Sequence, residues 1–269
     1  MKNKLSGLVD ASSLRAFAMI AVLAVIWGYF HWATGQIFLT PRNLSNLMTQ
    51  MSVTGIIAVG MLMLIVSANI DLSVGSVLGL AGGIAAYTLT NLGYPIPVAI
   101  GLALLAGIAI GVFQGVLTAK AGIPAFIVTL GGLLAWRGAV KWQLGGNTVP
   151  IADDTFKMIG QGNIPAWVGW VLAGIAVAFV IAMSIRSQRA IKEYGLGEGN
   201  IAAALAKSLI PIGAILIFIW VMNSYQGVPV PVLIFVGVAL IGSFLMSSTT
   251  FGRYLYAIGG NAEAARLSG

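Results

Sequence analysis

Residues 72–119 read LSVGSVLGLAGGIAAYTLTNLGYPIPVAIGLALLAGIAIGVFQGVLTA and contain no charged side chain between Asp71 and Lys120. These 48 residues are enough for two membrane-spanning helices, since one helix needs about 20 apolar residues. The segment Gly93-Tyr94-Pro95-Ile96-Pro97 divides them, because two prolines and a glycine favour a turn. The stretch therefore predicts a helical hairpin within a lipid bilayer.

The composition of the whole chain agrees with this prediction. Of its 269 residues, 59% are hydrophobic and 8% are charged, whereas a soluble domain has about 25% charged residues. The mean hydropathy is +0.98, and cysteine is absent from the sequence. These values exclude a water-soluble globule, a disordered chain and a disulfide-rich scaffold. They predict an all-α, polytopic transmembrane helix bundle.

Long uncharged gaps recur along the rest of the chain. They hold 26 residues after Arg15, 28 after Arg42, 16 after Lys120, 28 after Lys157 and 45 after Lys207. The last gap is divided by the turn-forming residues 223–231, so it accommodates two spans. Together with the hairpin, the gaps predict eight spans. The shortest is the segment from Ala121 to Trp136, whose flanking Lys120 and Arg137 could reach the headgroups.

The distribution of basic residues predicts the orientation in the membrane. An even number of spans puts both ends of the chain on one side. With that side cytoplasmic, four basic residues lie outside (Arg42, Arg137, Lys141 and Lys157) and ten inside (Lys2, Lys4, Arg15, Lys120, Arg186, Arg189, Lys192, Lys207, Arg253 and Arg266). We therefore expect a multi-pass protein of the bacterial cytoplasmic (inner) membrane with a cytoplasmic N-terminus. Basic loops beside anionic lipids also explain the net charge of +7 without nucleic acid.

A polar break follows the second predicted span and contains Asn69, Asp71 and Ser73. These residues are candidates for a solute pathway or for a helix break. In the structural interpretation, which we favour, Asp71 and Ser73 cap a helix that begins near Val74. In the alternative, Asp71 is the proton or cation site of an ion-coupled secondary transporter.

Other features indicate architecture rather than chemistry. Glycines at 75, 79 and 83 and at 107, 111 and 115 recur every four residues and predict close helix packing. His31 lies among aromatic residues typical of a membrane interface, and a single histidine without cysteine predicts no metal site. Residues 138–163 form either a docking surface or a solvated connector.

Neither a catalytic constellation nor a phosphate-binding loop of the G-x-x-x-x-G-K-[ST] pattern occurs in the sequence. We therefore expect this chain to be no enzyme and to carry no cofactor. An ATP-driven function would need a partner subunit that binds the ATP.

Three ordered segments carry a resemblance to a known family. They are residues 70–76 (IDLSVGS), 124–131 (PAFIVTLG) and 251–269 (FGRYLYAIGGNAEAARLSG). They resemble the signatures of ABC importer permeases of the ribose and xylose class. The additional apolar span between Lys207 and Tyr225 resembles the D-xylose members of this class more than the ribose members.

The resemblance implies a permease subunit for a pentose or related monosaccharide, most specifically D-xylose. Its partners would be a second permease copy, ATP-binding cassette ATPase subunits and an external sugar-binding protein. The ATPase-coupling role would fall on Gly260, Asn261, Glu263, Ala264, Ala265, Arg266 and Gly269. Glu263 and Arg266 would share one helix face and fix the register of docking.

The resemblance also predicts how the chain is organised. Residues 1–15 would form a cytoplasmic N-terminal segment, residues 16–252 the transmembrane permease domain, and residues 253–269 the cytoplasmic coupling segment. Members of the family continue past the position of Gly269 into further helices, so we expect this sequence to be truncated at its C-terminus.

Overall fold

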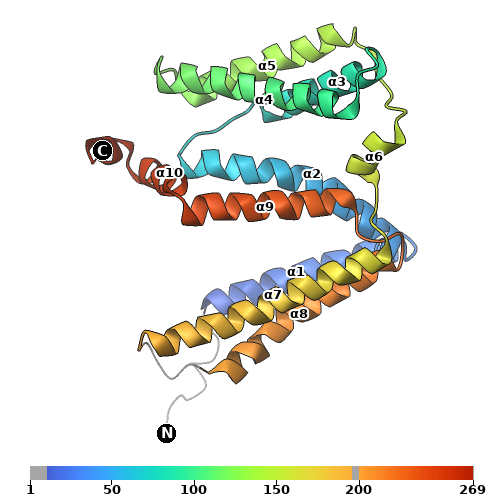
Figure 1. Cartoon of the computed structure of the whole chain (residues 1–269), viewed down its shortest axis with the longest axis vertical. Helices are drawn as coiled ribbons and strands as arrows, with labels where there is room; N and C mark the ends of the chain where they lie inside the picture. The colour runs from blue at the N-terminus through green and yellow to red at the C-terminus, as the bar shows by residue number, and fades with distance from the viewer. Residues whose placement is uncertain (1–10, 196–199, 269) are drawn as a thin grey trace. The chain divides into compact units, whose positions relative to one another are not determined.

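A computed structural model describes residues 11–195 and 200–268, which form helices joined by short turns without any strand (Figure 1). The helices are α1 (Ala11–Ala33), α2 (Pro41–Val66), α3 (Val74–Thr90), α4 (Ile96–Ala119), α5 (Ala125–Gln143), α6 (Asp154–Gln161), α7 (Ala166–Glu193), α8 (Ile201–Asn223), α9 (Val230–Ser248), α10 (Thr250–Gly260) and α11 (Ala262–Leu267). The predicted all-α class is confirmed.

Within the described residues, 5 helices are long and apolar enough to cross a membrane, namely α2, α4, α7, α8 and α9. Three further predicted spans coincide with α1, α3 and α5. A candidate span needs at least 18 residues, but the apolar segment Phe17–Ala33 of α1 and the helix α3 are shorter than this. The helix α5 contains the charged residues Arg137 and Lys141. The count of eight spans therefore stays a prediction.

The turns predicted from glycine and proline are confirmed. Gly93 adopts a φ of +68°, which is a conformation open to glycine, and Pro95 precedes the first turn of α4. Likewise α8 ends at Asn223 and α9 begins at Val230. Between them, Gly227 has a φ of +97° and lies so close to the Ile164 carbonyl that a Cβ atom would collide with it.

The predicted span from Ala121 to Trp136 is wrong in its bounds, because the helix is α5, Ala125–Gln143. Gly122 has a φ of +70° and Pro124 precedes the first helical residue, so the helix starts late. Arg137 and Lys141 are good helix formers and do not end it. The helix stops before Gly145 and Gly146, which adopt left-handed conformations with φ of +59° and +77°.

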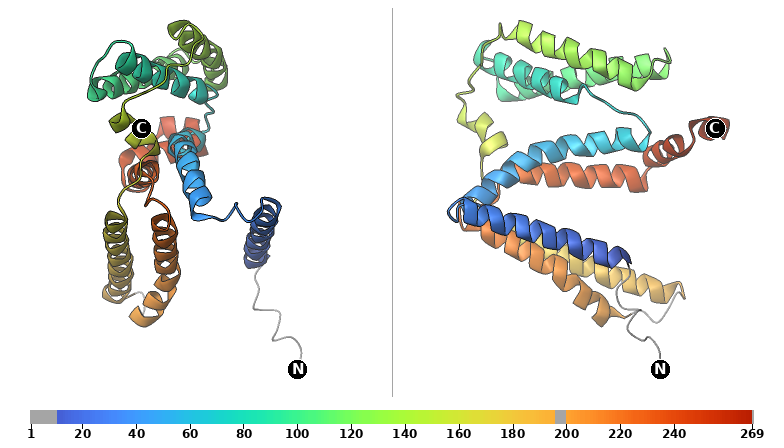
Figure 2. Two further views of the ribbon diagram at one scale, coloured as in Figure 1. Left: turned by 90° about the vertical axis from the view of Figure 1, so that its right-hand side faces the viewer. Right: turned by 180° about the vertical axis from the view of Figure 1, so that it is seen from behind.

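The chain divides into two compact units, and the first contains residues 1–48 and 163–229. Its main feature is the hairpin of α7 and α8, which lie side by side (Figures 1 and 2). At one end of the hairpin, the Asn223 amide donates a hydrogen bond of 3.2 Å to the Ala166 carbonyl. Gly169 permits this approach, since a Cβ there would lie 3.0 Å from the Asn223 Oδ1 atom.

The second unit contains residues 49–162 and 230–269. In it α3 packs against α4 and α5, and α6 packs against α9. The two helices α2 and α9 meet through small residues: a Cβ on Gly55 would collide with the Phe235 ring, and one on Gly242 would collide with Val59. Figure 2 shows α9 leading directly into α10 and α11.

Within the described part of this one chain, the glycine stripes account for a single close contact, so the expected close packing along them stays a prediction. Only Gly83 has a neighbour, with its Cβ position 2.9 Å from Val140. The positions of Gly75, Gly79, Gly107, Gly111 and Gly115 have no atom of the described chain within 4 Å. A period of four residues places small residues on one face of a helix, but it does not identify which neighbour that face meets.

Candidate functional site

The helix α2 ends in a tight backbone turn in the second unit. The Asn69 amide donates to the Leu64 carbonyl at 3.0 Å and the Ala68 amide to the Ile65 carbonyl at 2.9 Å. This pair of bonds is typical of a helix C-cap whose central residue is left-handed. That residue is Ala68, with a φ of 61°, where glycine is usual. The conformation costs about 1–2 kcal/mol for alanine.

The turn leads into a buried hydrogen-bond network between α3 and α4. The Asp71 carboxylate accepts from both the backbone amide and the hydroxyl of Ser73, each at 2.7 Å. Because that hydroxyl has only one proton, the Ser73 Oγ atom accepts in turn from the Gln114 amide nitrogen at 3.0 Å. Ser73 is fully buried and Gln114 nearly so. The carboxylate is thus held by donors at the beginning of α3, where the helix dipole also favours a negative charge.

This arrangement corrects one detail of the sequence interpretation. The helix α3 begins at Val74 and Ser73 occupies its N-cap position, but the Ser73 side chain makes no capping hydrogen bond. Its hydroxyl instead joins Asp71 to Gln114. The Ser73 backbone is in the helical region, with φ of −83° and ψ of −11°, whereas a residue whose side chain caps a helix is typically extended. Asn69 lies in the preceding turn, where its amide donates to the Ser67 carbonyl at 2.9 Å.

A cavity of about 270 Å³ adjoins the network. Its polar lining consists of Asn69, Asp71, Gln114, Thr118 and Thr129, and its apolar lining includes Leu64 and Ile70. The Thr129 hydroxyl of α5 donates to the Ala125 carbonyl at 2.8 Å and lies 3.3 Å from the Ile70 carbonyl. A small cavity with several polar groups on an apolar background has the chemistry to hold a small polar solute.

Sequence reasoning missed Gln114 and Thr129 as members of this site. Each is a buried polar residue within an otherwise apolar run, and this contrast was the available signal. Gly132 was missed as well. It is the residue of α5 that lets Gln114 and Ser73 approach, because a Cβ there would collide with the Gln114 amide.

The predicted coupling residues lie at the end of the same unit, on α10 and α11. The Asn261 side chain caps α11 by accepting from the Ala264 amide at 2.9 Å. Glu263 and Arg266 approach to 4.0 Å across one face of the helix. Gly260, Asn261, Glu263, Ala264 and Arg266 are exposed and Ala265 is half-buried, whereas Gly269 lies outside the described residues.

Gly259 brings α10 into contact with the end of α2, directly before the polar break. A Cβ atom on Gly259 would collide with the Val66 carbonyl oxygen and would lie 3.4 Å from the Ser67 Cα atom. Figures 1 and 2 show α10 beside the C-terminal end of α2, where the break begins. The predicted ATPase-coupling segment therefore touches the end of α2, which is followed directly by cavity-lining residues.

The other candidate residues have structural surroundings. His31 is half-buried, and its Nδ1 atom accepts from the Leu39 amide at 3.3 Å. Within residues 138–163, Asp153 caps α6 by accepting from the Phe156 amide at 2.9 Å. No cluster of metal-ligating side chains occurs among the described residues.

The long apolar helices define an integral membrane protein. The chain belongs to the family described as "branched-chain amino acid transport system / permease component", which matches residues 43–269. The xylose transport system permease protein of Escherichia coli is 40% identical over 257 residues, covering 96% of this chain and 65% of that protein. The chain thus spans about two thirds of the length of this relative.

Further relatives are permeases for the same class of solute. The xylose transport system permease protein of Haemophilus influenzae is 40% identical, over 96% of this chain and 68% of that protein. The ribose import permease protein of the same organism is 32% identical, over 84% of this chain and 70% of that protein. The predicted resemblance to ribose and xylose permeases is confirmed. No solved structure matches the chain.

Proposed function

We propose that this chain is the membrane-spanning permease subunit of an ATP-driven importer for a monosaccharide, with D-xylose as the substrate. The observation that carries the proposal is the 40% identity to xylose permeases over 96% of the chain. The family description names branched-chain amino acids, but the individual relatives that cover most of the chain are named for pentoses.

In this proposal the energy comes from a separate ATPase, which binds the ATP and docks on α10 and α11. Both helices expose small side chains, and the contact of α10 with the end of α2 through Gly259 supports a mechanical link to the cavity. An external binding protein delivers the sugar, a second copy completes the permease, and the chain lies in the inner membrane with α10 and α11 in the cytoplasm.

The ion-coupled alternative would use Asp71 as its cation site. Its carboxylate already accepts two hydrogen bonds from Ser73, so the geometry supports a structural role for Asp71 at the start of α3. We therefore propose ATP rather than an ion gradient as the energy source.

The substrate is tested by uptake in cells from which this chain has been deleted. We expect the deletion to abolish uptake of labelled D-xylose, and a plasmid copy to restore it. Restored uptake should survive an uncoupler of the proton gradient and cease when ATP is depleted. Loss of L-leucine uptake with unchanged D-xylose uptake would overturn the proposed substrate, and uptake that follows the proton gradient would overturn the energy source.

The docking role is tested by Ala264→Arg. An arginine on the exposed face of α11 should block the ATPase without disturbing the fold, so co-purification of the ATPase and D-xylose uptake should each fall at least about tenfold. Ala202→Arg is the matched control, since Ala202 is an exposed alanine near the start of α8. If Ala264→Arg and Ala202→Arg showed equal ATPase co-purification and equal D-xylose uptake, the docking role would be contradicted.

A further inference from the structure

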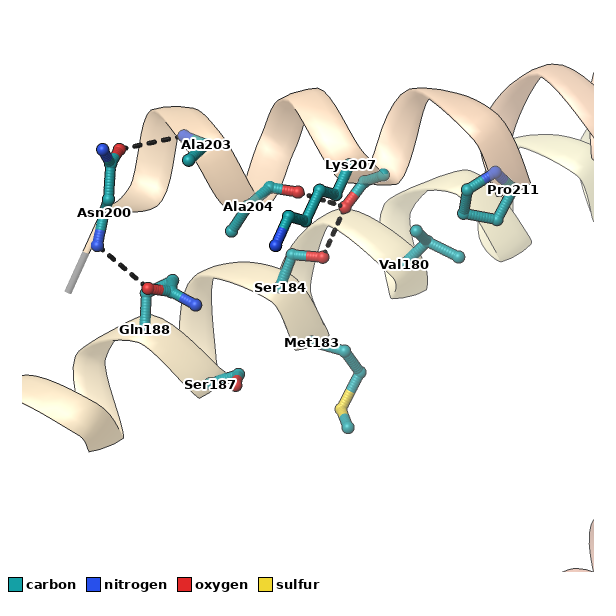
Figure 3. Close-up of a pocket in the computed structure, with 11 residues that line it drawn as sticks. Val180, Met183, Ser184, Ser187, Gln188, Asn200, Ala203, Ala204, Lys207 and Pro211 are labelled. Carbon is teal, nitrogen blue, oxygen red and sulfur yellow. Dashed lines mark hydrogen bonds between the residues drawn. The ribbon is translucent and has the colours of Figure 1, made fainter. Parts of the chain in front are cut away.

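A groove of about 550 Å³ lies between α7 and α8 in the first unit, and neither the proposed transport nor the polar break uses it. It is located near the end of the hairpin where the two helices are joined. Figure 3 shows its residues: Ser184, Ser187 and Gln188 come from α7, whereas Asn200, Lys207 and Pro211 come from the α8 side.

Two hydrogen bonds hold the walls of the groove in place. The Ser184 and Ser208 Oγ atoms are 2.6 Å apart. Since the Ser208 hydroxyl donates to the Ala204 carbonyl at 2.9 Å, Ser184 is the donor of this pair. Nearer the joined end, the Gln188 Oε1 atom accepts from the Asn200 backbone amide at 2.9 Å.

Two side chains of the groove, Gln188 and Lys207, present hydrogen-bond donors to a ligand, and the Ser187 hydroxyl can either donate or accept. With its oxygen bound to Asn200, the Gln188 amide is left with its nitrogen for a ligand. The Lys207 ammonium points into the space between the two helices (Figure 3). Among the described residues the ion pairs are Lys157–Asp154 and Arg266–Glu263, so Lys207 has no acidic partner there. Such a set of donors with a net positive charge suits a phosphate anion.

The rest of the lining is apolar and identifies the source of that anion. Val180, Met183 and Pro211 continue the groove from the donors toward the middle of the two helices. Both helices are long enough to cross a membrane, and Lys207 lies six residues after the first residue of α8, or about 9 Å along the helix axis. From there the long Lys207 side chain can extend its ammonium toward the headgroups, while the apolar residues of the groove suit an acyl chain.

We propose that this groove binds the head group of an anionic phospholipid, with Lys207 and the Gln188 amide nitrogen donating to the phosphate. The lipid tail lies along Val180, Met183 and Pro211. Three more basic residues at the same end of α7, Arg186, Arg189 and Lys192, raise the local positive potential and attract anionic lipid. A zwitterionic lipid gains less from this site, because its own ammonium group is repelled.

Native mass spectrometry of the purified chain tests this proposal. The chain is released from micelles that contain equal amounts of phosphatidylglycerol and phosphatidylcholine, and the retained lipid is counted. We expect preferential retention of phosphatidylglycerol, and a loss of about tenfold in Lys207→Gln, since one charged hydrogen bond is removed. Lys207→Arg keeps the charge and should keep the lipid.

The control is Lys120→Gln, which removes the same charge from an exposed residue at the end of α4. Circular dichroism should show equal helix content in all variants. Equal retention of the two lipids, or unchanged retention in Lys207→Gln, would overturn the proposal. Displacement of the lipid by millimolar inorganic phosphate would also overturn it, because the groove would then serve a soluble anion.

Discussion

The polar break after α2 and the groove between α7 and α8 contain similar polar residues, but these residues have different hydrogen-bond partners. In the break, the hydroxyl of Ser73 and the amide of Gln114 are bonded to each other and to Asp71. In the groove, Lys207 has no acidic partner among the described residues, and Gln188, whose oxygen is bound to Asn200, lines the cavity. A closed network stabilises a backbone conformation, whereas open donors are available for a ligand.

The approach of α10 to the break gives the largest expected effect. In Gly259→Ala the new Cβ atom would meet the Val66 carbonyl, which belongs to the backbone and cannot move aside as a side chain could. We expect a loss of about 2–3 kcal/mol in unfolding free energy. Thermal unfolding in detergent measures the loss of stability, and D-xylose uptake measures the loss of coupling.

Gly260→Ala is the matched control for this variant. Gly260 is the next residue of the same helix, and its Cβ position has no atom within 4 Å. We expect it to change the unfolding free energy by no more than about 0.5 kcal/mol. If both alanines behave alike, the contact between α10 and the break does not hold the two segments together.

A pair of serine variants compares the two regions directly. Ser73→Ala leaves the nearly buried Gln114 amide without its acceptor and should destabilise the chain by about 2 kcal/mol. Ser184→Ala removes one hydrogen bond, but Ser208 keeps its bond to Ala204, so we expect a loss of about 0.5–1 kcal/mol.

Thermal unfolding ranks the two serine variants, and Ser187→Ala serves as the exposed control. A larger loss in Ser184→Ala than in Ser73→Ala would reverse the comparison. It would mean that the groove, and not the break, is the region held by its own hydrogen bonds.

The smallest expected effect concerns the left-handed turn before the network. Ala68→Gly removes the steric cost of a positive φ and should stabilise the chain by about 0.5–1 kcal/mol. Ala106→Gly, in the middle of α4, should destabilise it by about the same amount. Thermal unfolding measures both variants, and we expect the unfolding temperature to rise in Ala68→Gly and to fall in Ala106→Gly. A loss in both would show that the turn is not strained.

Much of the fold followed from local signals. Apolar runs predicted the long helices, and the prolines and glycines near residues 95 and 227 predicted two turns that the structure contains. The bounds of α5 were missed because the charge of Arg137 suggested an end, while the helix continues through it. The role of Asn69, Asp71 and Ser73 as pathway or helix-break residues stays a prediction. Local signals did not show that Gln114 and Thr129, from other helices, line the same cavity as Asn69 and Asp71.

The sequence by itself determined the membrane class, the all-helical fold, two of the turns and the resemblance to sugar permeases, because each rests on composition or on residues close together in the chain. Only the tertiary structure decided that Gln114 meets Ser73 across a separation of 41 residues, that Gly259 touches Val66, and that Lys207 faces Gln188. In apolar helices every face is hydrophobic, so the pattern does not say which face meets a neighbour. That choice depends on how the side chains pack, which is a property of the whole fold.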